Sequence, residues 1–209
     1  MTINVMLVDD HAVVRAGYKR LIDNEPGLRV IAEAECIADA QEAMRAHEIN
    51  VVVMDLALRG ESGIEGIRRL GGRYPHLRIM VFSMYDHCVY VTQALRYGAL
   101  GYVTKYARPM EMLSALRKVA SGQRALSSDI VERLAQHAAG GSSPLHDLTP
   151  REFEILRMTA NGLTPNDIAV QIRLSPKTIF NQLSVIRAKL NVRSDIQLYR
   201  LALEEGLVD

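Results

Sequence analysis

The chain has 209 residues, of which 48% are hydrophobic, and its formal net charge at pH 7 is +1. That length suffices for one ordinary domain and a second, smaller one. No apolar run approaches the roughly 18 residues that cross a bilayer, and the chain leads directly into "INVMLVDD" without a signal-like segment, so we expect a cytoplasmic protein with no membrane association. Cys36 and Cys88 stand singly, which argues against a disulfide framework or a zinc site.

The first part of the chain repeats a short apolar run followed by a helical pattern. Strands are expected at residues 3–8, 29–34, 50–54, 78–82 and 100–103. Five such units in a row predict an α/β domain with a doubly wound, five-stranded parallel sheet. In one common strand order, 2-1-3-4-5, ligands bind at the carboxyl ends of the strands beside the first and third.

Polar side chains follow the predicted strands. Asp9 and Asp10 come after the first strand and Asp55 after the third, while Ser83 and Lys105 end the fourth and fifth. Three carboxylates brought together repel one another unless a cation joins them, and Mg²⁺ prefers oxygen ligands. Such a set is suited to phosphoryl transfer, with a carboxylate as nucleophile and the cations screening the phosphoryl oxygens. Taken singly, such residues more often form a solvated turn, a helix cap or an ordinary strand end than a site.

The segment 123–147 differs in composition from the chain before it. A serine at 127 or 128 could cap a short amphipathic helix, and "AGGSSP" at 139–144 is typical of a flexible connector. The apolar positions of that helix would be Val131, Leu134 and Ala138. These features divide the chain into residues 1–122, a linker at 123–147, and a helical region at 148–209.

The last sixty residues contain repeated helix-start signals. A hydroxyl residue followed by proline, which suits an N-cap and the first helical position, occurs at 149–150, 164–165 and 175–176. Glu152 completes a capping box with Thr149, and Ser194 with Gln197 indicates a fourth start. Gly162 fits a helix end, as does the glycine at 206.

The third of these helices has one apolar stripe, formed by Ile179, Leu183, Ile186 and Leu190. The opposite face carries Lys177, Asn181, Ser184 and Ala188. Residues 168–194 hold five Lys or Arg and no acid, so this region is locally basic on a nearly neutral chain. A small all-α helix-turn-helix domain that binds DNA explains the pattern, and a plain helical bundle with solvated charges explains it equally well.

Several motifs in the first part carry a family resemblance: "VDDH" at 8–11, "MD" at 54–55, "FS" at 82–83 and "GYVTKYARP" at 101–109. With these, residues 1 to about 122 resemble the flavodoxin-like receiver domain of two-component response regulators. The resemblance implies that Asp55 is the phosphoacceptor. It also implies a Mg²⁺ site and a set of switch residues. The Mg²⁺ ligands would be Asp10 directly, Asp9 through water, Asp55 and the carbonyl of Ala57; the switch residues would be Ser83, Tyr102 and Lys105.

Residues 148–192, "LTPREFEILRMTANGLTPNDIAVQIRLSPKTIFNQLSVIRAKLNV", resemble the LuxR-type helix-turn-helix domain. The two resemblances together indicate the NarL/FixJ class. They imply a transcription factor, not an enzyme beyond its own phosphorylation and dephosphorylation, with a sensor histidine kinase and double-stranded DNA as partners and a homodimer as the phosphorylated form. The expected DNA-contacting residues are Lys177, Thr178, Phe180, Asn181, Ser184 and Arg187.

Phe180 departs from the LuxR-type pattern, which commonly has Lys in "TVK" where this chain has "TIF". The ring could pack into the helical core, which we take as the first expectation, or it could touch a thymine methyl group in the major groove.

Phosphorylation should draw Ser83 and Lys105 inward and let Tyr102 fill the vacated space. The alternative from another class is a phosphorylation-independent DNA-binding regulator whose receiver serves for dimerisation or docking. A phosphatase with an aspartate nucleophile would require a second acid at position 57, where Ala57 stands, and a quorum-type sensor would require a small-molecule pocket instead of the acidic cluster.

Overall fold

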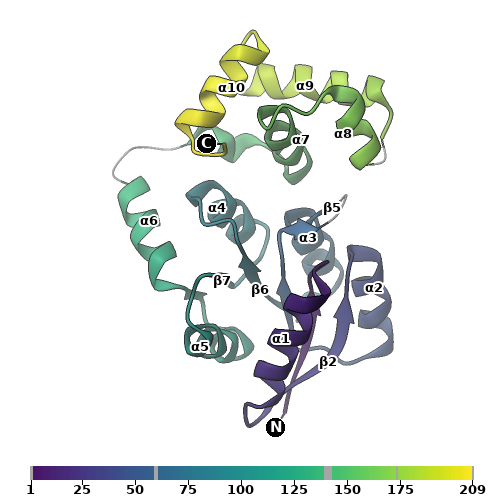
Figure 1. Cartoon of the computed structure of the whole chain (residues 1–209), viewed down its shortest axis with the longest axis vertical. Coiled ribbons are helices and arrows are strands. Elements are labelled where there is room, and N and C mark those ends of the chain that lie inside the picture. Colours follow the sequence, from purple (N-terminus) through teal and green to yellow (C-terminus); the bar gives the residue numbers. More distant parts are fainter. Residues whose placement is uncertain (1, 59–60, 139–142, 173, 209) are drawn as a thin grey trace. The chain divides into compact units, whose positions relative to one another are not determined.

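In the computed structural model, residues 2–58, 61–138, 143–172 and 174–208 are described (Figure 1). The chain forms two compact units, Met1–Gln136 and His137–Asp209. Among the described residues, no helix is long and apolar enough to span a membrane.

The first unit is built on a six-stranded parallel sheet in the order β2-β1-β3-β6-β7-β8. Its strands are β1 (Ile3–Val8), β2 (Leu28–Ala34), β3 (Val51–Met54), β6 (Arg78–Ser83), β7 (Gly101–Thr104) and β8 (Ala125–Leu126). The predicted fold class and the order of the five predicted strands are confirmed. The sheet has one strand more than predicted, because β8 has only two residues and so carries no periodicity. A separate antiparallel pair, β4 (Ala57–Leu58) and β5 (Glu61–Ser62), follows β3.

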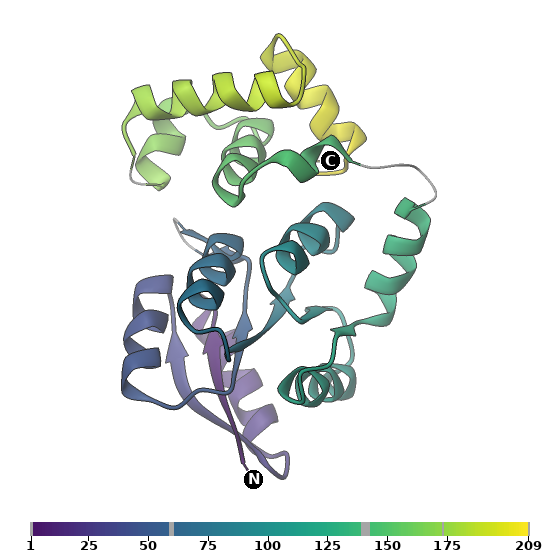
Figure 2. The same cartoon turned by 180° about the vertical axis from the view of Figure 1, so that it is seen from behind.

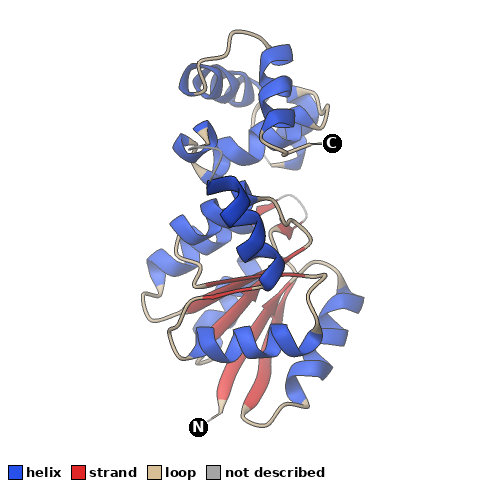
Figure 3. Cartoon of the chain, turned by 90° about the vertical axis from the view of Figure 1, so that its left-hand side faces the viewer, coloured by secondary structure: helices blue, strands red, loops and turns tan. Residues whose placement is uncertain are grey.

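Helices cover both faces of this sheet (Figures 2 and 3). They are α1 (Ala12–Asp23), α2 (Ile37–Ala46), α3 (Gly63–Arg73), α4 (Cys88–Arg96) and α5 (Pro109–Ala120). Alternate strand residues such as Val53 and Phe82 pack in one cluster with Ile22 of α1 and Met112 of α5. Because strand side chains alternate between faces, the intervening residues, also buried, point toward α2, α3 and α4. Both faces are therefore core, and only the strand ends are open to hold a site.

The segment after α5 returns to the sheet as β8 and α6 (Ser128–Ala138). The predicted helix start is confirmed, and Asp129 accepts a hydrogen bond from Thr104 of β7 at 2.8 Å. The predicted apolar stripe is wrong at Val131, which is 52% exposed, because Ile130 is the residue buried against the receiver unit. The structure thus packs residues 123–136 with the first unit. Residues 139–142 of the predicted connector lie outside the described residues.

The second unit is entirely helical among its described residues. It contains a 3-10 helix (Pro144–Asp147), α7 (Pro150–Ala160), α8 (Pro165–Gln171), α9 (Pro176–Lys189) and α10 (Asp195–Glu204). All four predicted N-caps are confirmed, since the side chains of Thr149, Thr164, Ser175 and Ser194 each accept a hydrogen bond from a backbone N–H of the first turn. Gly162 follows α7 with φ of +83°, as a glycine helix end requires.

Candidate functional site

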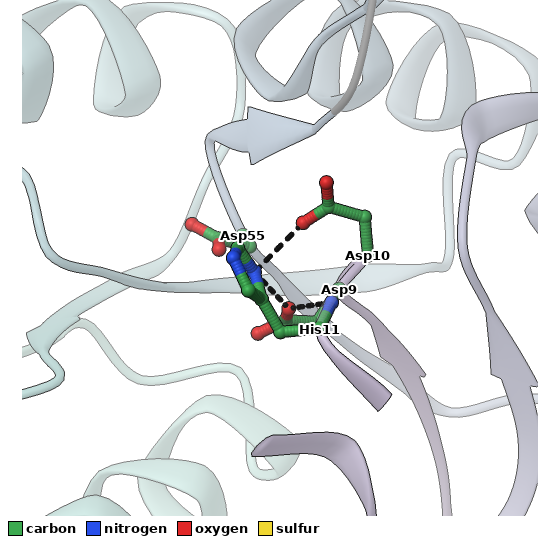
Figure 4. A group of neighbouring side chains, drawn as sticks. All are labelled: Asp9, Asp10, His11 and Asp55. Atoms are coloured by element: carbon green, nitrogen blue, oxygen red, sulfur yellow. Dashed lines mark hydrogen bonds and ion pairs between the residues drawn. The ribbon is translucent and has the colours of Figure 1, made fainter. Parts of the chain in front are cut away.

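The carboxyl ends of β1 and β3 bring four potential metal ligands together. Ligand atoms of Asp9, Asp10, His11 and Asp55 all lie within 4.8 Å of one another (Figure 4). The side chains of Asp9 and Asp55 are 9% and 3% exposed, so their charges are largely withdrawn from water. This oxygen-rich set fits a hard divalent cation such as Mg²⁺.

Lys105, directly after β7, provides the positive charge at this edge. Its Nζ donates hydrogen bonds to Asp9 Oδ2 and Asp55 Oδ2, both at 2.6 Å. Burial alone would lower the pKa of Lys105, but these hydrogen bonds and the nearby negative charges outweigh it and raise the pKa above its ordinary value. The lysine is therefore a fixed cation spanning the ends of β1 and β3.

Ser83 and Tyr102 already occupy inward positions. Ser83 Oγ donates to Asp55 Oδ1 at 2.8 Å, and Tyr102, fully buried, donates its hydroxyl to the carbonyl of Tyr85 at 2.6 Å. Burial in turn raises the pKa of Tyr102 well above its ordinary value, so its hydroxyl stays protonated. Ser83 and Tyr102 thus both point inward, Ser83 toward Asp55 and Tyr102 toward the loop after β6.

Two further residues shape the site, and the sequence analysis did not single them out. The Nδ1 of His11 lies 2.8 Å from Asp10 Oδ1 and 3.2 Å from Asp9 Oδ1. Gly63 begins α3 against the backbone of Asp55, where an added Cβ would lie 2.2 Å from the Asp55 carbonyl oxygen. His11 was visible within "VDDH"; Gly63 stands in the loop after Asp55, but the reason it must be glycine arises only from this tertiary approach. Ala57 stands beside the site, its N–H donating to Asp55 Oδ1 at 3.2 Å.

The outward face of α9 is the candidate nucleic-acid interface. Its stripe of Ile179, Leu183, Ile186 and, just after the helix, Leu190 is buried, as predicted. Lys177, Asn181 and Ser184 are exposed, whereas Thr178 and Arg187 are half-buried. Thr178 lies against the Ser175 cap, and Arg187 donates to Asp195 Oδ1 at 2.5 Å.

Phe180 is 55% exposed, so the expectation that its ring joins the core is wrong. The physical reason is that Ile179 and Leu183 already fill the inward positions, and Phe180 lies about 100° from Ile179 around the helix. The exposed ring shares the outward face with Asn181 and Ser184, whose Oγ donates back to the Phe180 carbonyl at 3.0 Å.

Two family models match the two units. Residues 5–117 match the response regulator receiver domain, and residues 146–202 match the bacterial regulatory proteins of the luxR family. The chain belongs to the NarL/FixJ class of response regulators. It is 36% identical to the response regulator UvrY of Escherichia coli (strain K12) over 98% of this chain and 95% of UvrY.

Other relatives support this family assignment. The response regulator GacA of Pseudomonas aeruginosa is 36% identical over 99% of this chain and 98% of GacA. Among solved structures, RcsB from Salmonella enterica serovar Typhimurium, bound to the promoter P1flhDC in the presence of the phosphomimetic BeF3⁻, has a TM-score of 0.72 at 26% identity. That likeness covers 96% of this chain and 98% of the RcsB chain.

Proposed function

We propose that this response regulator is a cytoplasmic transcription factor whose DNA binding is raised by phosphorylation of Asp55. A sensor histidine kinase would supply the phosphoryl group. One Asp55 carboxylate oxygen forms the bond to phosphorus as the phosphorus–nitrogen bond of the phosphohistidine breaks. The observation that carries the proposal is the surroundings of Asp55: a buried carboxylate with a hydroxyl on one oxygen and an ammonium on the other.

A bound Mg²⁺ would screen the negative charge on the transferring phosphoryl oxygens. We assign Asp10 as a direct ligand, Asp9 as a ligand through water, and the carboxylate of Asp55 and the carbonyl of Ala57 as the others. Lys105, directly after β7, would screen the same charge and help to orient the donor. We assign no enzymatic activity beyond this self-phosphorylation and self-dephosphorylation.

The receiver would pass the signal through the loop after β6. Once phosphorylated, Asp55 presents oxygens further from β3, and Ser83 and Lys105 must follow them to keep their hydrogen bonds. Tyr102 donates a hydrogen bond to the Tyr85 carbonyl in the same loop. A shift of Ser83 would therefore change the conformation of this loop, which leads into α4. The second candidate is a regulator whose DNA binding does not depend on phosphorylation and whose receiver serves for dimerisation or docking.

DNA recognition would fall to the outward face of α9. We assign Lys177 to a phosphate, Asn181 to a base edge and Phe180 to a thymine methyl group, with Thr178, Ser184 and Arg187 as supporting contacts. An exposed aromatic on a recognition helix favours this assignment, because its apolar surface gains most when a partner covers it.

The active form would be a homodimer on two DNA half-sites. A support for pairing lies on α10, where Ile196, Tyr199 and Leu203 are 81%, 44% and 41% exposed. Their spacing of three and four residues places them in one stripe, and a second copy would cover it. We propose residues 1–122 as the receiver and 148–209 as the DNA-binding domain, with 123–147 as a connecting segment whose first part, 123–136, packs with the receiver.

The experiment that tests this function uses the full chain, a small-molecule phosphodonor and Mg²⁺. We expect the mass gain of one phosphoryl group on Asp55, together with tighter and more extended footprints on promoter DNA. Phosphorylation without any change in DNA affinity would favour the phosphorylation-independent candidate. No mass gain under any donor would overturn the phosphoacceptor assignment.

A further inference from the structure

Arg15 borders the acidic group through the backbone of Asp9. Its Nη1 donates to the Asp9 carbonyl oxygen at 2.5 Å, and its side chain is only 10% exposed. Asp9, Arg15, Tyr18 and Asp55 line the same small hollow at this edge of the sheet. A buried guanidinium that contacts a backbone carbonyl fixes the position of that carbonyl, because its donors sit in a rigid plane.

The Asp9 backbone is held on both sides. Its N–H donates to the Ala34 carbonyl at the end of β2, at 3.1 Å, while its carbonyl accepts from Arg15. Arg15 itself lies one turn into α1, where its N–H donates to the His11 carbonyl at 3.0 Å. The loop carrying Asp9 and Asp10 is thereby tied to β2 on one side and to α1 on the other.

The charge of Arg15 is compensated away from the acidic group. Its Nη2 donates to Glu35 Oε1 at 2.6 Å, and its Nε lies 3.7 Å from Glu33 Oε2. Lys19, on the next turn of α1, also pairs with Glu33, at 2.6 Å. Because Glu33 and Glu35 balance its charge, Arg15 contacts only the backbone of Asp9 in these bonds. The Asp9 carboxylate is therefore available to Lys105 and to a metal ion.

We propose that Arg15 is a positioning residue for the divalent cation: it fixes the backbone of Asp9 so that the carboxylates of Asp9 and Asp10 face Asp55. The inference rests on the Mg²⁺ site of the proposed function. The alternative is that Arg15 affects the metal site only through its charge. A guanidinium near the site repels Mg²⁺, so removing its charge alone would tighten binding, whereas removing a positioning contact weakens it.

The test is calorimetric titration of the full chain with Mg²⁺ in the wild type and three variants: Arg15→Ala, Arg15→Lys and, as matched control, Lys19→Ala. Lys19 lies on the same helix and contacts the same Glu33, but its described contacts leave Asp9 untouched. We expect Arg15→Ala to weaken Mg²⁺ binding by about tenfold, the lower end for residues that orient metal ligands. Lys19→Ala should change it by less than about twofold, as exposed ion pairs contribute little.

Arg15→Lys separates charge from geometry, because it keeps the charge and loses the planar fork. We expect it also to weaken binding, and labelling by phosphodonor to need more Mg²⁺ in both Arg15 variants while the rate at saturating Mg²⁺ is retained. Thermal unfolding in a chelator checks that each variant is folded; if Arg15→Ala is not, Arg15→Lys carries the test.

Unchanged or tighter Mg²⁺ binding in a folded Arg15 variant would overturn the positioning role while leaving the proposed function intact. A wild-type chain that takes up no Mg²⁺ would overturn both. A drop in labelling that saturating Mg²⁺ does not restore would also overturn it, since it would place Arg15 in the transfer step itself.

Discussion

Each unit buries a carboxylate against a lysine, and the two pairs differ in what surrounds them. In the first unit, Lys105 meets Asp55 and Asp9 at 2.6 Å, with Asp10 beside them. In the second, Lys189 meets Glu152 at 2.7 Å. The first group has three carboxylates for one lysine and the exposed His11; the second has one carboxylate for one lysine.

The hydrogen bonds sharpen the contrast. Glu152 Oε2 also accepts from the N–H of Thr149 in a capping box, so this oxygen is held by two donors of the protein itself. The group at Asp55 carries excess negative charge at the open end of a sheet, an arrangement that costs stability unless a cation or a phosphoryl donor uses it. A buried ion pair is therefore a sign of function where its charges do not balance, and a sign of structure where they do.

The largest expected effect is the loss of phosphorylation in Asp55→Asn. An amide is no nucleophile, so labelling by a phosphodonor should disappear, while Asp39→Asn, an exposed acid on α2, should label normally. Thermal stability should not fall, because Lys105 keeps Asp9 as partner and one repulsive charge is gone. Stoichiometric labelling of the Asn variant at another residue would sink the assignment, and a large stability loss would break the contrast with Glu152.

The next effect is on the stability of the second unit in Glu152→Gln. Burial alone would raise the pKa of Glu152, but hydrogen bonds from Lys189 and Thr149 outweigh it and hold the pKa below its ordinary value. Losing the charge should cost about 1–2 kcal/mol near neutral pH, the range for a helix cap. Urea unfolding of the full chain measures this cost, with the exposed Glu204→Gln as control.

The pH dependence of that difference has a defined sign. A group whose folded pKa is lowered stabilises the fold above its unfolded pKa and loses this contribution as the pH falls through the folded value. The gap between wild type and Glu152→Gln should therefore narrow in acid. A gap that stays constant down to the acid limit would show that the charge of Glu152 is not what stabilises the unit.

The sequence predicted the features whose causes are local, and it missed those that depend on tertiary contacts. Asp9, Asp55, Ser83 and Lys105 were placed at one edge because parallel strands end together, and that rule needs only strand positions and order. The helix caps of the second unit depend on residues within one turn. Gly63 and Arg15 could not be found, since their roles depend on backbones that approach only after folding.

Two predictions of side-chain direction failed for a related reason. Val131 was expected inward, yet Ile130 is buried, and the hydrogen bond from Thr104 of β7 to Asp129 holds the start of α6 in this orientation. Phe180 was expected to pack inward, yet its ring is exposed. Periodicity gives the width of an apolar stripe, and neighbouring elements decide which flanking residue joins it.

A third prediction concerns a lysine placed on the exposed face of α9. Phe180→Lys should leave stability within about 0.5 kcal/mol, as for other exposed positions. It should raise non-specific DNA affinity and steepen the salt dependence by about one phosphate contact, while relaxing the preference at one base pair. Footprinting and salt titration on matched DNA measure both. Unchanged DNA preference would remove Phe180 from the interface, and a clear loss of stability would mean that its ring supports the core after all.

The smallest expected effect concerns the lifetime of the phosphoryl group. Ala57 lies beside Asp55 but has no side-chain group to position an attacking water. Tyr85, two residues after Ser83, is large enough to shield the phosphoryl group from water, and its ring is held by stacking on Tyr90 with centroids 4.4 Å apart. We therefore expect slow self-dephosphorylation. Ala57→Asn adds an amide that can hold a water, and one added hydrogen bond in the transition state corresponds to a rise in rate of about tenfold.

Ala57→Val, which adds bulk without a polar group, is the control. The decay of labelled protein after removal of the donor measures the rate. An equal acceleration in both variants would point to loosening of β4 instead of water positioning, and an unchanged or slower decay in Ala57→Asn would mean that position 57 does not limit hydrolysis.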